Sequence, residues 1–235
     1  MRKMPRSVDA IVGEQVHRWT LEQQGRRRAA EEVKRTRPVL AISRQFGALG
    51  AALARQVASA LHYSFWDRDL LGAICTNSGT TEQILNSVDE RRRNGIAELV
   101  ALFADGDAVS SQEYHVELAR VVHTIASHGN AVIVGRGAQY LLEPDVVLRV
   151  RAVCELTKRI KGLMGRSDMT EDEARRLVKA TDADRRRFIR QHFDRDCDDP
   201  IEYDLVINTG RVPLHMATDM IVAACRARFG SEIPG

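Results

Sequence analysis

The segment from Val39 to Ala54 carries the residue pattern best suited to chemistry. Its first residues, VLAIS, are mostly apolar and predict a short strand, after which Gly47 and Gly50 favour a turn. The residues that follow predict a helix running to about His62. A strand that turns tightly into a helix presents unpaired N–H groups and the positive end of the helix dipole to an anion. We therefore expect this turn to hold a phosphate group.

The turn lacks the side chains of the standard phosphate-binding loop, which ends in Gly-Lys-Ser or Gly-Lys-Thr. The corresponding stretch here reads Leu49-Gly50-Ala51-Ala52, so both the lysine and the hydroxyl are missing. Backbone N–H groups would then carry the binding, and a plain strand-to-helix turn is the alternative. The residues expected to bind phosphate are Phe46, Gly47, Ala48, Leu49, Gly50 and Ala51.

Two arginines and an aspartate lie where strands are expected to end. Arg44 is inside the turn, and Arg136 stands between two glycines after the apolar run 131–134. Guanidinium groups match the geometry of phosphate, although each arginine has an ion pair as its alternative role. Asp67 follows a short expected strand at 63–66, so it would either face the predicted ligand site or cap the next helix.

Composition is that of an ordinary globular protein. The 235 residues are 44% hydrophobic and 29% charged, with a net charge of +3, so nucleic acid is not an expected partner. Arginine runs at 26–28, 91–93 and 185–187 fit either solvated helix faces or anion binding. Seven histidines and four widely spaced cysteines show no metal-binding spacing, and no metal ligand is predicted.

The ends and the apolar runs of the chain point to the cytoplasm. No secretory signal follows Arg2 and Lys3, and no run of about 18 apolar residues predicts a membrane span. The cysteines are expected to be free thiols in a reducing compartment.

Strands and helices are expected to alternate after Pro38, which favours a doubly wound parallel sheet. Ligands in such sheets lie beyond the carboxyl ends of the strands, where we also expect Arg151. A capping-box pattern starts a helix at Thr170. The remaining expected strands are 131–134, 146–150 and 204–209, and the remaining expected helices are 81–103, 111–128 and 213–229.

Residues 1–37 form a separate, basic extension. Val8, Val12, Val16 and Trp19 fall on one helical stripe, which is too small to form a core alone. The stripe would pack on the main domain or on a second copy of the chain, giving a homodimer.

The chain resembles the cytidylate kinase-like family, which is related to the P-loop nucleoside monophosphate kinases. The resemblance spans residues 39 to about 222. The segments that carry it are ISRQFG at 42–47, WDRDL at 66–70, VIVGRG at 132–137, DRRRF at 184–188, and DP at 199–200 with YDLVINT at 203–209.

The resemblance implies an α/β, three-layer P-loop kinase fold with a five-stranded parallel sheet, a helical insert at about 70–128, a lid at about 164–193 and an N-terminal helical extension. The domains would be 1–37 and 38–235. ATP with Mg²⁺ would be the donor, and a nucleoside monophosphate, CMP or dCMP, the acceptor. A non-catalytic nucleotide-binding regulatory module and a kinase of another small acceptor are the alternatives.

Roles for single residues follow from the same resemblance. Arg44 would supply part of the charge of the missing lysine, and Arg136 would grip the acceptor's phosphate. Leu49 stands where the family usually has glycine; it would either tolerate helical dihedrals or crowd the nucleotide. Asp67, Arg68 and Arg136 would bind the acceptor. The catalytic arginines would be Arg44, Arg136, Arg159, Arg185 and Arg186, the last three closing over the transferring phosphate.

Overall fold

The computed structural model describes residues 7–27, 38–88, 90–101 and 109–230. Its contacts divide the chain into two compact units. One unit comprises residues 1–37 with 68–129, and the other comprises 38–67 with 130–235. We call them the helical unit and the sheet unit, and each is described by itself. The boundary predicted at residue 37 stays a prediction.

The sheet unit is built on five parallel strands in the order β2-β3-β1-β4-β5. The order places β1 at the centre, so the turn that follows β1 lies at the middle of the sheet's carboxyl edge. The strands are β1 (Val39–Arg44), β2 (Ser64–Trp66), β3 (Ala131–Val134), β4 (Val147–Val153) and β5 (Leu205–Asn208). This parallel α/β sheet confirms the predicted fold class.

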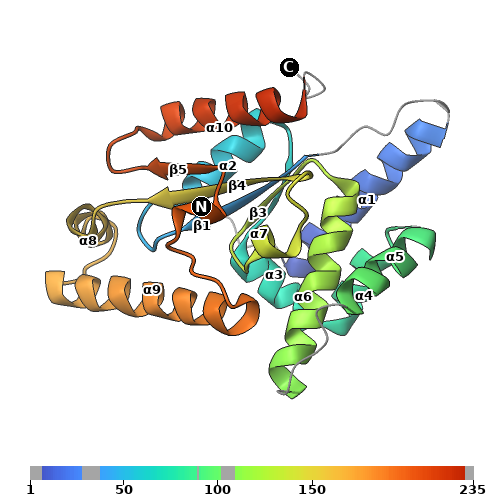
Figure 1. The fold of residues 1–235 in the computed structure, drawn as a ribbon, viewed down its shortest axis with the longest axis horizontal. Helices are drawn as coiled ribbons and strands as arrows, with labels where there is room; N and C mark the ends of the chain where they lie inside the picture. The colour runs from blue at the N-terminus through green and yellow to red at the C-terminus, as the bar shows by residue number, and fades with distance from the viewer. Residues whose placement is uncertain (1–6, 28–37, 89, 102–108, 231–235) are drawn as a thin grey trace. The chain divides into compact units, whose positions relative to one another are not determined.

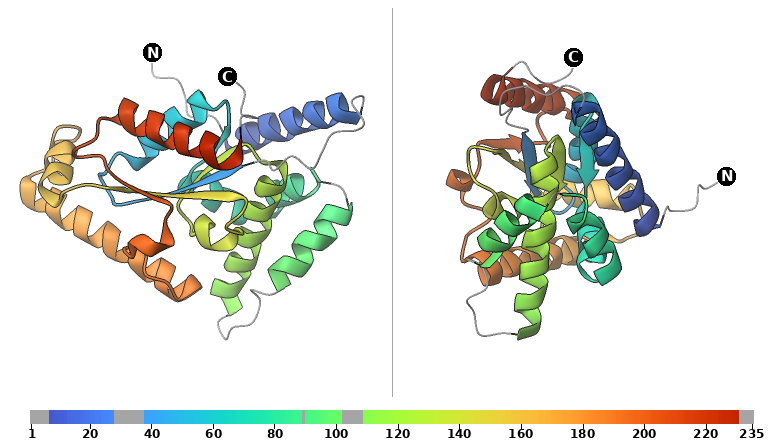
Figure 2. Two further views of the ribbon diagram at one scale, coloured as in Figure 1. Left: turned by 45° about the horizontal axis from the view of Figure 1, so that its top comes forward. Right: turned by 90° about the vertical axis from the view of Figure 1, so that its right-hand side faces the viewer.

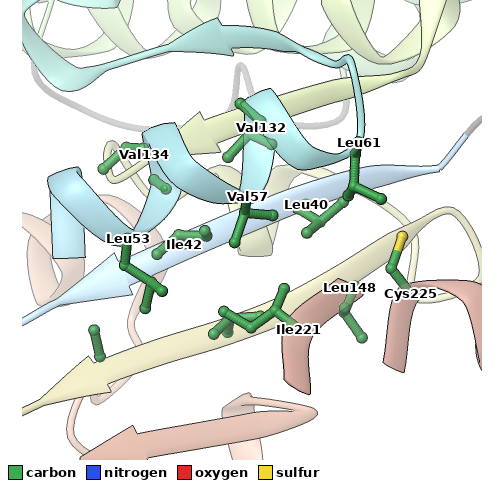
Figure 3. Close-up of a cluster of buried hydrophobic side chains, with 14 of the residues drawn as sticks. Leu40, Ile42, Leu53, Val57, Leu61, Val132, Val134, Leu148, Ile221 and Cys225 are labelled. Carbon is green, nitrogen blue, oxygen red and sulfur yellow. The ribbon is translucent and has the colours of Figure 1, made fainter. Parts of the chain in front are cut away.

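Two helices cover one face of this sheet, α2 (Gly50–Ala60) and α10 (Leu214–Phe229) (Figure 1). Helix α2 buries Leu53, Val57 and neighbouring small residues at helical spacing, which places an apolar stripe against the strands. Figure 3 shows these side chains meeting Leu40 and Ile42 of β1, Leu148 of β4 and Ile221 of α10. This core fixes where the turn between β1 and α2 must lie.

Two further helices, α8 (Leu156–Met164) and α9 (Glu171–Phe193), follow β4 at the carboxyl end of the strands (Figures 1 and 2). Helix α9 begins with the predicted capping box: Thr170 and Glu173 exchange side-chain and backbone hydrogen bonds. Ile160, Ala174 and Val178 form a small buried cluster that also packs against Phe46 of the turn. The smaller elements of this unit are α7 (Ala138–Leu141) and the 3₁₀ turn Pro200–Glu202.

The helical unit contains the amino-terminal helix α1 and four helices from the middle of the chain. Val12 and Trp19, from the predicted stripe of α1, are buried in this unit. The Trp19 ring stacks on the His128 ring at 3.7 Å, and Thr80 donates to the Asp9 carboxylate at 2.8 Å. The helices are α1 (Val8–Arg27), α3 (Arg68–Cys75), α4 (Ser78–Leu85), α5 (Glu90–Ala101) and α6 (Val109–His128).

Several predicted boundaries were wrong. The single helix expected at 81–103 is divided into α4 and α5: α4 begins early, at the Asn77 cap, and ends at Leu85, where the Asn86 N–H donates to the Glu82 carbonyl. Helix α6 begins at Val109, before Ser111. Strand β4 continues to Val153, so Arg151 lies inside the strand and not beyond its end. Among the described helices, none has the length and apolar character needed to cross a membrane.

Candidate active site

The turn between β1 and α2, residues 44–50, is tied to its neighbours by hydrogen bonds at several points. The Gln45 N–H donates to the Ala152 carbonyl at 3.0 Å, and the Gln45 side chain accepts from the Cys154 N–H at 2.9 Å. The Thr209 hydroxyl donates to the Ala48 carbonyl at 2.8 Å. We call this turn the phosphate loop, after the phosphate binding that the sequence predicts for it. Its shape is set by the strand ends on one side of β1.

Two residues of the phosphate loop have left-handed backbone dihedrals. Gly47 has φ of 80° and Leu49 has φ of 56°. Leu49 stands at the N-cap of α2 without a side-chain cap, and the first N–H groups of that helix have no intrahelical acceptor. Leu49 therefore takes the left-handed conformation that favours glycine. One of the two expectations for Leu49, that it would have ordinary helical dihedrals, is wrong, because its φ is positive.

A buried ion pair holds the start of the phosphate loop. The Asp182 carboxylate on α9 accepts from the Phe46 N–H at 2.7 Å and from the Arg159 guanidinium at 2.5 Å. Arg159 also donates to the Phe46 carbonyl at 3.2 Å. The Phe46 N–H, one of the six backbone groups expected to bind phosphate, is thus bound to a carboxylate here. Arg159 is likewise engaged within the chain.

Asp182 was missed at the level of the sequence, although a signal existed. It continues the buried stripe of α9 that runs through Ala174 and Val178 at four-residue spacing, where an acidic residue is unusual. A carboxylate on an apolar stripe requires a buried partner. The sequence did not reveal the partners, because Phe46 lies 136 residues away.

Arg44 and Arg185 lie beside the phosphate loop, and Arg136 follows the end of β3. The Arg44 guanidinium lies so close to Gly135 that a Cβ there would stand 2.1 Å from Nη1. Arg185 of α9 donates to the Arg44 carbonyl at 2.9 Å and lies 5.5 Å from the centre of the Phe46 ring. Arg44 at the end of β1 therefore lies against the segment that carries Arg136, and Arg185 of α9 reaches the end of the same strand.

Arg136 occupies an unusual backbone segment. Gly135, Arg136 and Gly137 all have left-handed dihedrals, with φ of 78°, 55° and 71°. The Arg136 guanidinium lies 5.7 Å from the centre of the Phe188 ring on α9. Burial, and then the nearby Arg136 charge, lowers the pKa of His192, which keeps this imidazole neutral at neutral pH. This segment places the Arg136 cation at the end of β3, and the left-handed conformation of Arg136 costs conformational free energy.

Arg186 belongs to a neighbouring network. It lies 3.4 Å from the Asp198 carboxylate, which also binds buried Arg151. Arg151 in turn donates to the Ser43 hydroxyl at 2.8 Å. Burial alone would lower the pKa of Arg151, but Tyr203, Cys197 and Asp198 outweigh it and raise that pKa above its ordinary value. Arg151 is therefore a buried structural cation that ties α9 to β4 through Asp198.

The predicted acceptor residues divide between the two units. Asp67 follows β2 in the sheet unit and lies 3.5 Å from the Arg55 guanidinium. Arg68 is the first residue of α3 in the helical unit and lies 3.5 Å from Asp69. Both residues thus make an ion pair within the chain, and the contact with an acceptor stays a prediction.

The chain's donor groups suit a polyphosphate better than a bare cation. Arginine side chains and the start of α2 offer hydrogen bonds to phosphate oxygens, whereas Ala51 offers no hydroxyl to Mg²⁺. One acidic group, formed by Asp196, Cys197 and Asp198, has metal-like spacing among the described residues. Arg151 and Arg186 already bind Asp198, so this group fits an ion pair network better than a metal. All four cysteines are free thiols.

A parallel α/β sheet whose central strand turns directly into a helix is typical of a broad class of phosphate-binding folds. A profile of the cytidylate kinase-like family matches residues 39–211, and the chain belongs to that family. Cytidylate kinase of Methanothrix thermoacetophila is 25% identical over 159 residues, covering 68% of this chain and 87% of that protein. Family membership supports a role in phosphoryl transfer and nucleotide binding.

A solved structure shares the fold. An uncharacterized protein from Eubacterium ventriosum superimposes with a TM-score of 0.62 at 20% identity, covering 81% of this chain and 99% of that chain. At this identity the likeness concerns the fold alone.

Proposed function

We propose that this protein is an ATP-dependent, cytoplasmic kinase of a nucleoside monophosphate, CMP or dCMP. The observation that carries the proposal is that Arg185 donates to the Arg44 carbonyl and that the Arg44 guanidinium lies against Gly135, the residue before Arg136. Phosphoryl transfer requires positioning and positive charge more than covalent chemistry. Family membership and the cytidylate kinase relative support the nucleotide as substrate.

In this proposal the phosphate loop binds the polyphosphate of ATP through backbone N–H groups at the start of α2. Mg²⁺, held by the phosphates and water, neutralises negative charge on the nucleotide when bound. Arg136 binds the phosphate of the acceptor, and Arg44 and Arg185 add positive charge where the phosphoryl group transfers. Helix α9 brings Arg185 and Arg186 to this edge and helps to exclude water.

A non-catalytic nucleotide-binding module is the second candidate, and one observation favours it. The phosphate loop combines the absent lysine with a left-handed Leu49 and with a Phe46 N–H bound to Asp182. A loop of this kind would bind nucleotide without accelerating transfer. The two candidates differ in whether ADP is formed.

A coupled assay of ADP formation with Mg²⁺-ATP and a panel of monophosphates tests the proposal. We expect ADP release that depends on CMP or dCMP and that falls in an Arg136→Ala variant. Binding of ATP without ADP release with any monophosphate would favour the non-catalytic module. Turnover with only a non-nucleotide acceptor would replace the substrate and keep the phosphotransferase.

A further inference from the structure

We propose that Asp182 is a positioning residue of the phosphate loop, supplied by helix α9. Its carboxylate fixes the Phe46 backbone and so sets the loop in the shape that binds the ATP phosphates. This inference rests on the proposed function for the identity of the nucleotide. Its structural half, the control of loop geometry by α9, stands on contacts within the sheet unit.

The first step is that Asp182 uses both carboxylate oxygens. Oδ1 accepts from the Phe46 N–H at 2.7 Å, and Oδ2 accepts from Arg159 Nη1 at 2.5 Å. The side chains of Asp182 and Arg159 are only 11% and 9% exposed. A charged hydrogen bond in such surroundings is strong, and its loss leaves a buried donor without its acceptor. The carboxylate is therefore fixed to the loop.

The second step is that Arg159 completes the grip on the same residue. Its Nη1 also donates to the Phe46 carbonyl at 3.2 Å. The peptide group before the Phe46 Cα is held by Asp182, and the peptide group after it is held by Arg159. Two successive peptide planes at the entry to the loop are thus fixed by side chains from α8 and α9.

The third step concerns Gly47, the next residue. A Cβ at Gly47 would stand 3.1 Å from the Arg159 Cβ, and its φ of 80° is left-handed. The loop backbone therefore passes directly against α8. Since the Phe46 ring also packs in the apolar cluster of Ile160 and Val178, the loop entry is held on its backbone and its side chain by the same two helices.

An opposite role deserves comparison, in which Asp182 is an internal anion that nucleotide phosphate must displace. Displacement would strip the buried Arg159 of its carboxylate and would pull Ala174 and Val178 of α9 away from Ile160 of α8. Both costs favour a permanent contact. The two roles predict opposite effects of removing the carboxylate: positioning predicts weaker ATP binding, and competition predicts tighter binding.

The experiment compares Asp182→Asn with Asp184→Asn, a matched change two residues along the same helix. Asp184 is exposed and pairs with Arg187 at 3.2 Å. For Asp182→Asn we expect the KM for ATP to rise about tenfold or more and the KM for CMP to stay within about twofold. Asp184→Asn should change neither. Hydrogen exchange of residues 43–52 should accelerate in Asp182→Asn alone.

A second variant covers the case in which Asp182→Asn does not fold. The double variant Asp182→Leu/Arg159→Met replaces the buried pair with apolar groups of similar size, which preserves stability in many proteins. We expect it to fold, to show fast exchange at residues 43–52 and to bind ATP weakly in a direct titration. Exchange at the wild-type rate in this variant would overturn the inference.

The outcomes separate this inference from the proposed function. If the wild-type protein forms no ADP with any monophosphate, the proposed function fails, and hydrogen exchange of the loop still decides the role of Asp182. If the wild type is active and Asp182→Asn matches it in exchange and in KM for ATP, the inference fails alone. Tighter ATP binding by Asp182→Asn would overturn positioning in favour of an internal competitor.

Discussion

At the scale of single residues, the site depends on side chains held in costly conformations. Arg136 and Leu49 both have left-handed dihedrals, which cost an L-residue about 1 to 2 kcal/mol. Such strain persists where the surrounding structure requires it, and it gathers at functional sites. For Arg136 the question is whether its charge acts on the reaction, and for Leu49 it is how much the backbone strain costs. Each can be measured with a variant.

Replacement of Arg136 by alanine tests whether its charge acts on the reaction. The variant keeps a Cβ on the left-handed backbone and removes the guanidinium. We expect turnover with Mg²⁺-ATP and CMP to fall on the order of 10²-fold, because an electrostatic contact to the transferring phosphate is lost. Arg187→Ala, on the exposed side of α9, is the matched control and should be active. Unchanged turnover in Arg136→Ala would remove this residue from the mechanism.

Leu49 offers a measurement of backbone strain in the phosphate loop. Leu49→Gly and Leu49→Ala both remove the side chain beyond Cβ, but only glycine relieves the left-handed penalty. We expect the glycine variant to have a free energy of unfolding about 1 kcal/mol higher than the alanine variant, measured in urea. Equal stabilities would mean that the loop relaxes at this position and that the dihedral of Leu49 is not imposed by its surroundings.

At the scale of elements, local patterns predicted what local forces determine. The continuous apolar run 131–134 coincides with β3, and the Thr170 capping box starts α9 where expected. The end of β4 was missed because Arg151, a charged residue, follows the predicted run 146–150. Arg151 is buried through Ser43 and Asp198, which lie 108 and 47 residues away in the chain. Long-range polar pairs of this kind, Asp182 with Phe46 included, leave no local periodicity to detect.

Some arginines of the site could be placed from the sequence, and others could not. The positions of Arg44 and Arg136 follow from the rule that parallel strands end at one edge, and the structure places the Arg44 guanidinium against Gly135, next to Arg136 in the chain. The partner of Arg159 does not follow from that rule. Its guanidinium is directed to Asp182 by the packing of α8 on α9, which depends on the whole apolar cluster.

The start of α9 provides a pH-dependent prediction. Hydrogen bonds from the Thr170 N–H and hydroxyl lower the pKa of Glu173 in the folded chain. A lowered folded pKa adds stability above the unfolded value of about 4.5, and this stability is lost as the pH falls through the folded pKa. We therefore expect Glu173→Gln to be less stable than the wild type at pH 7.

Thermal unfolding of Glu173→Gln from pH 7 downward measures this effect. The gap between the two proteins should close as the pH drops below about 4.5, because the wild-type carboxylate becomes protonated. Asp172→Asn is the control for the helix dipole, since it alters charge in the same turn outside the capping box. A gap that persists unchanged at acidic pH would assign the stabilisation to packing and not to the charge.

At the scale of the whole molecule, the chain divides its two tryptophans between two units. Trp66 is buried in the sheet unit, and Trp19 is buried in the helical unit, where it stacks on His128. The extension at 1–37 was expected to pack one stripe on the main domain or on a second copy. Val12 and Trp19 of that stripe are buried within the helical unit of the same chain.

Replacement of Trp19 by alanine tests how far this packing supports the rest of the chain. Removal of a buried tryptophan costs about 3 kcal/mol or more, because the cavity fills only in part. The main contacts of α1 are with α3 and α4, and its Trp19 stacks on His128 of α6; these helices belong to the helical unit. Since opening follows local contacts, we expect hydrogen exchange to accelerate in α3, α4 and α6 and to remain slow in β1 and β3.

Leu21→Ala is the matched control on the same helix, because that side chain is 54% exposed and its loss should leave exchange unchanged. Equal acceleration in the strands of the sheet unit would show that the two units open as one, contrary to their separate contact networks. Acceleration confined to the helical unit would mean that α1 stabilises the segment expected as the insert. The phosphate loop would then keep its geometry while that segment opens, since its restraints from α8, α9 and the strand ends lie within the sheet unit.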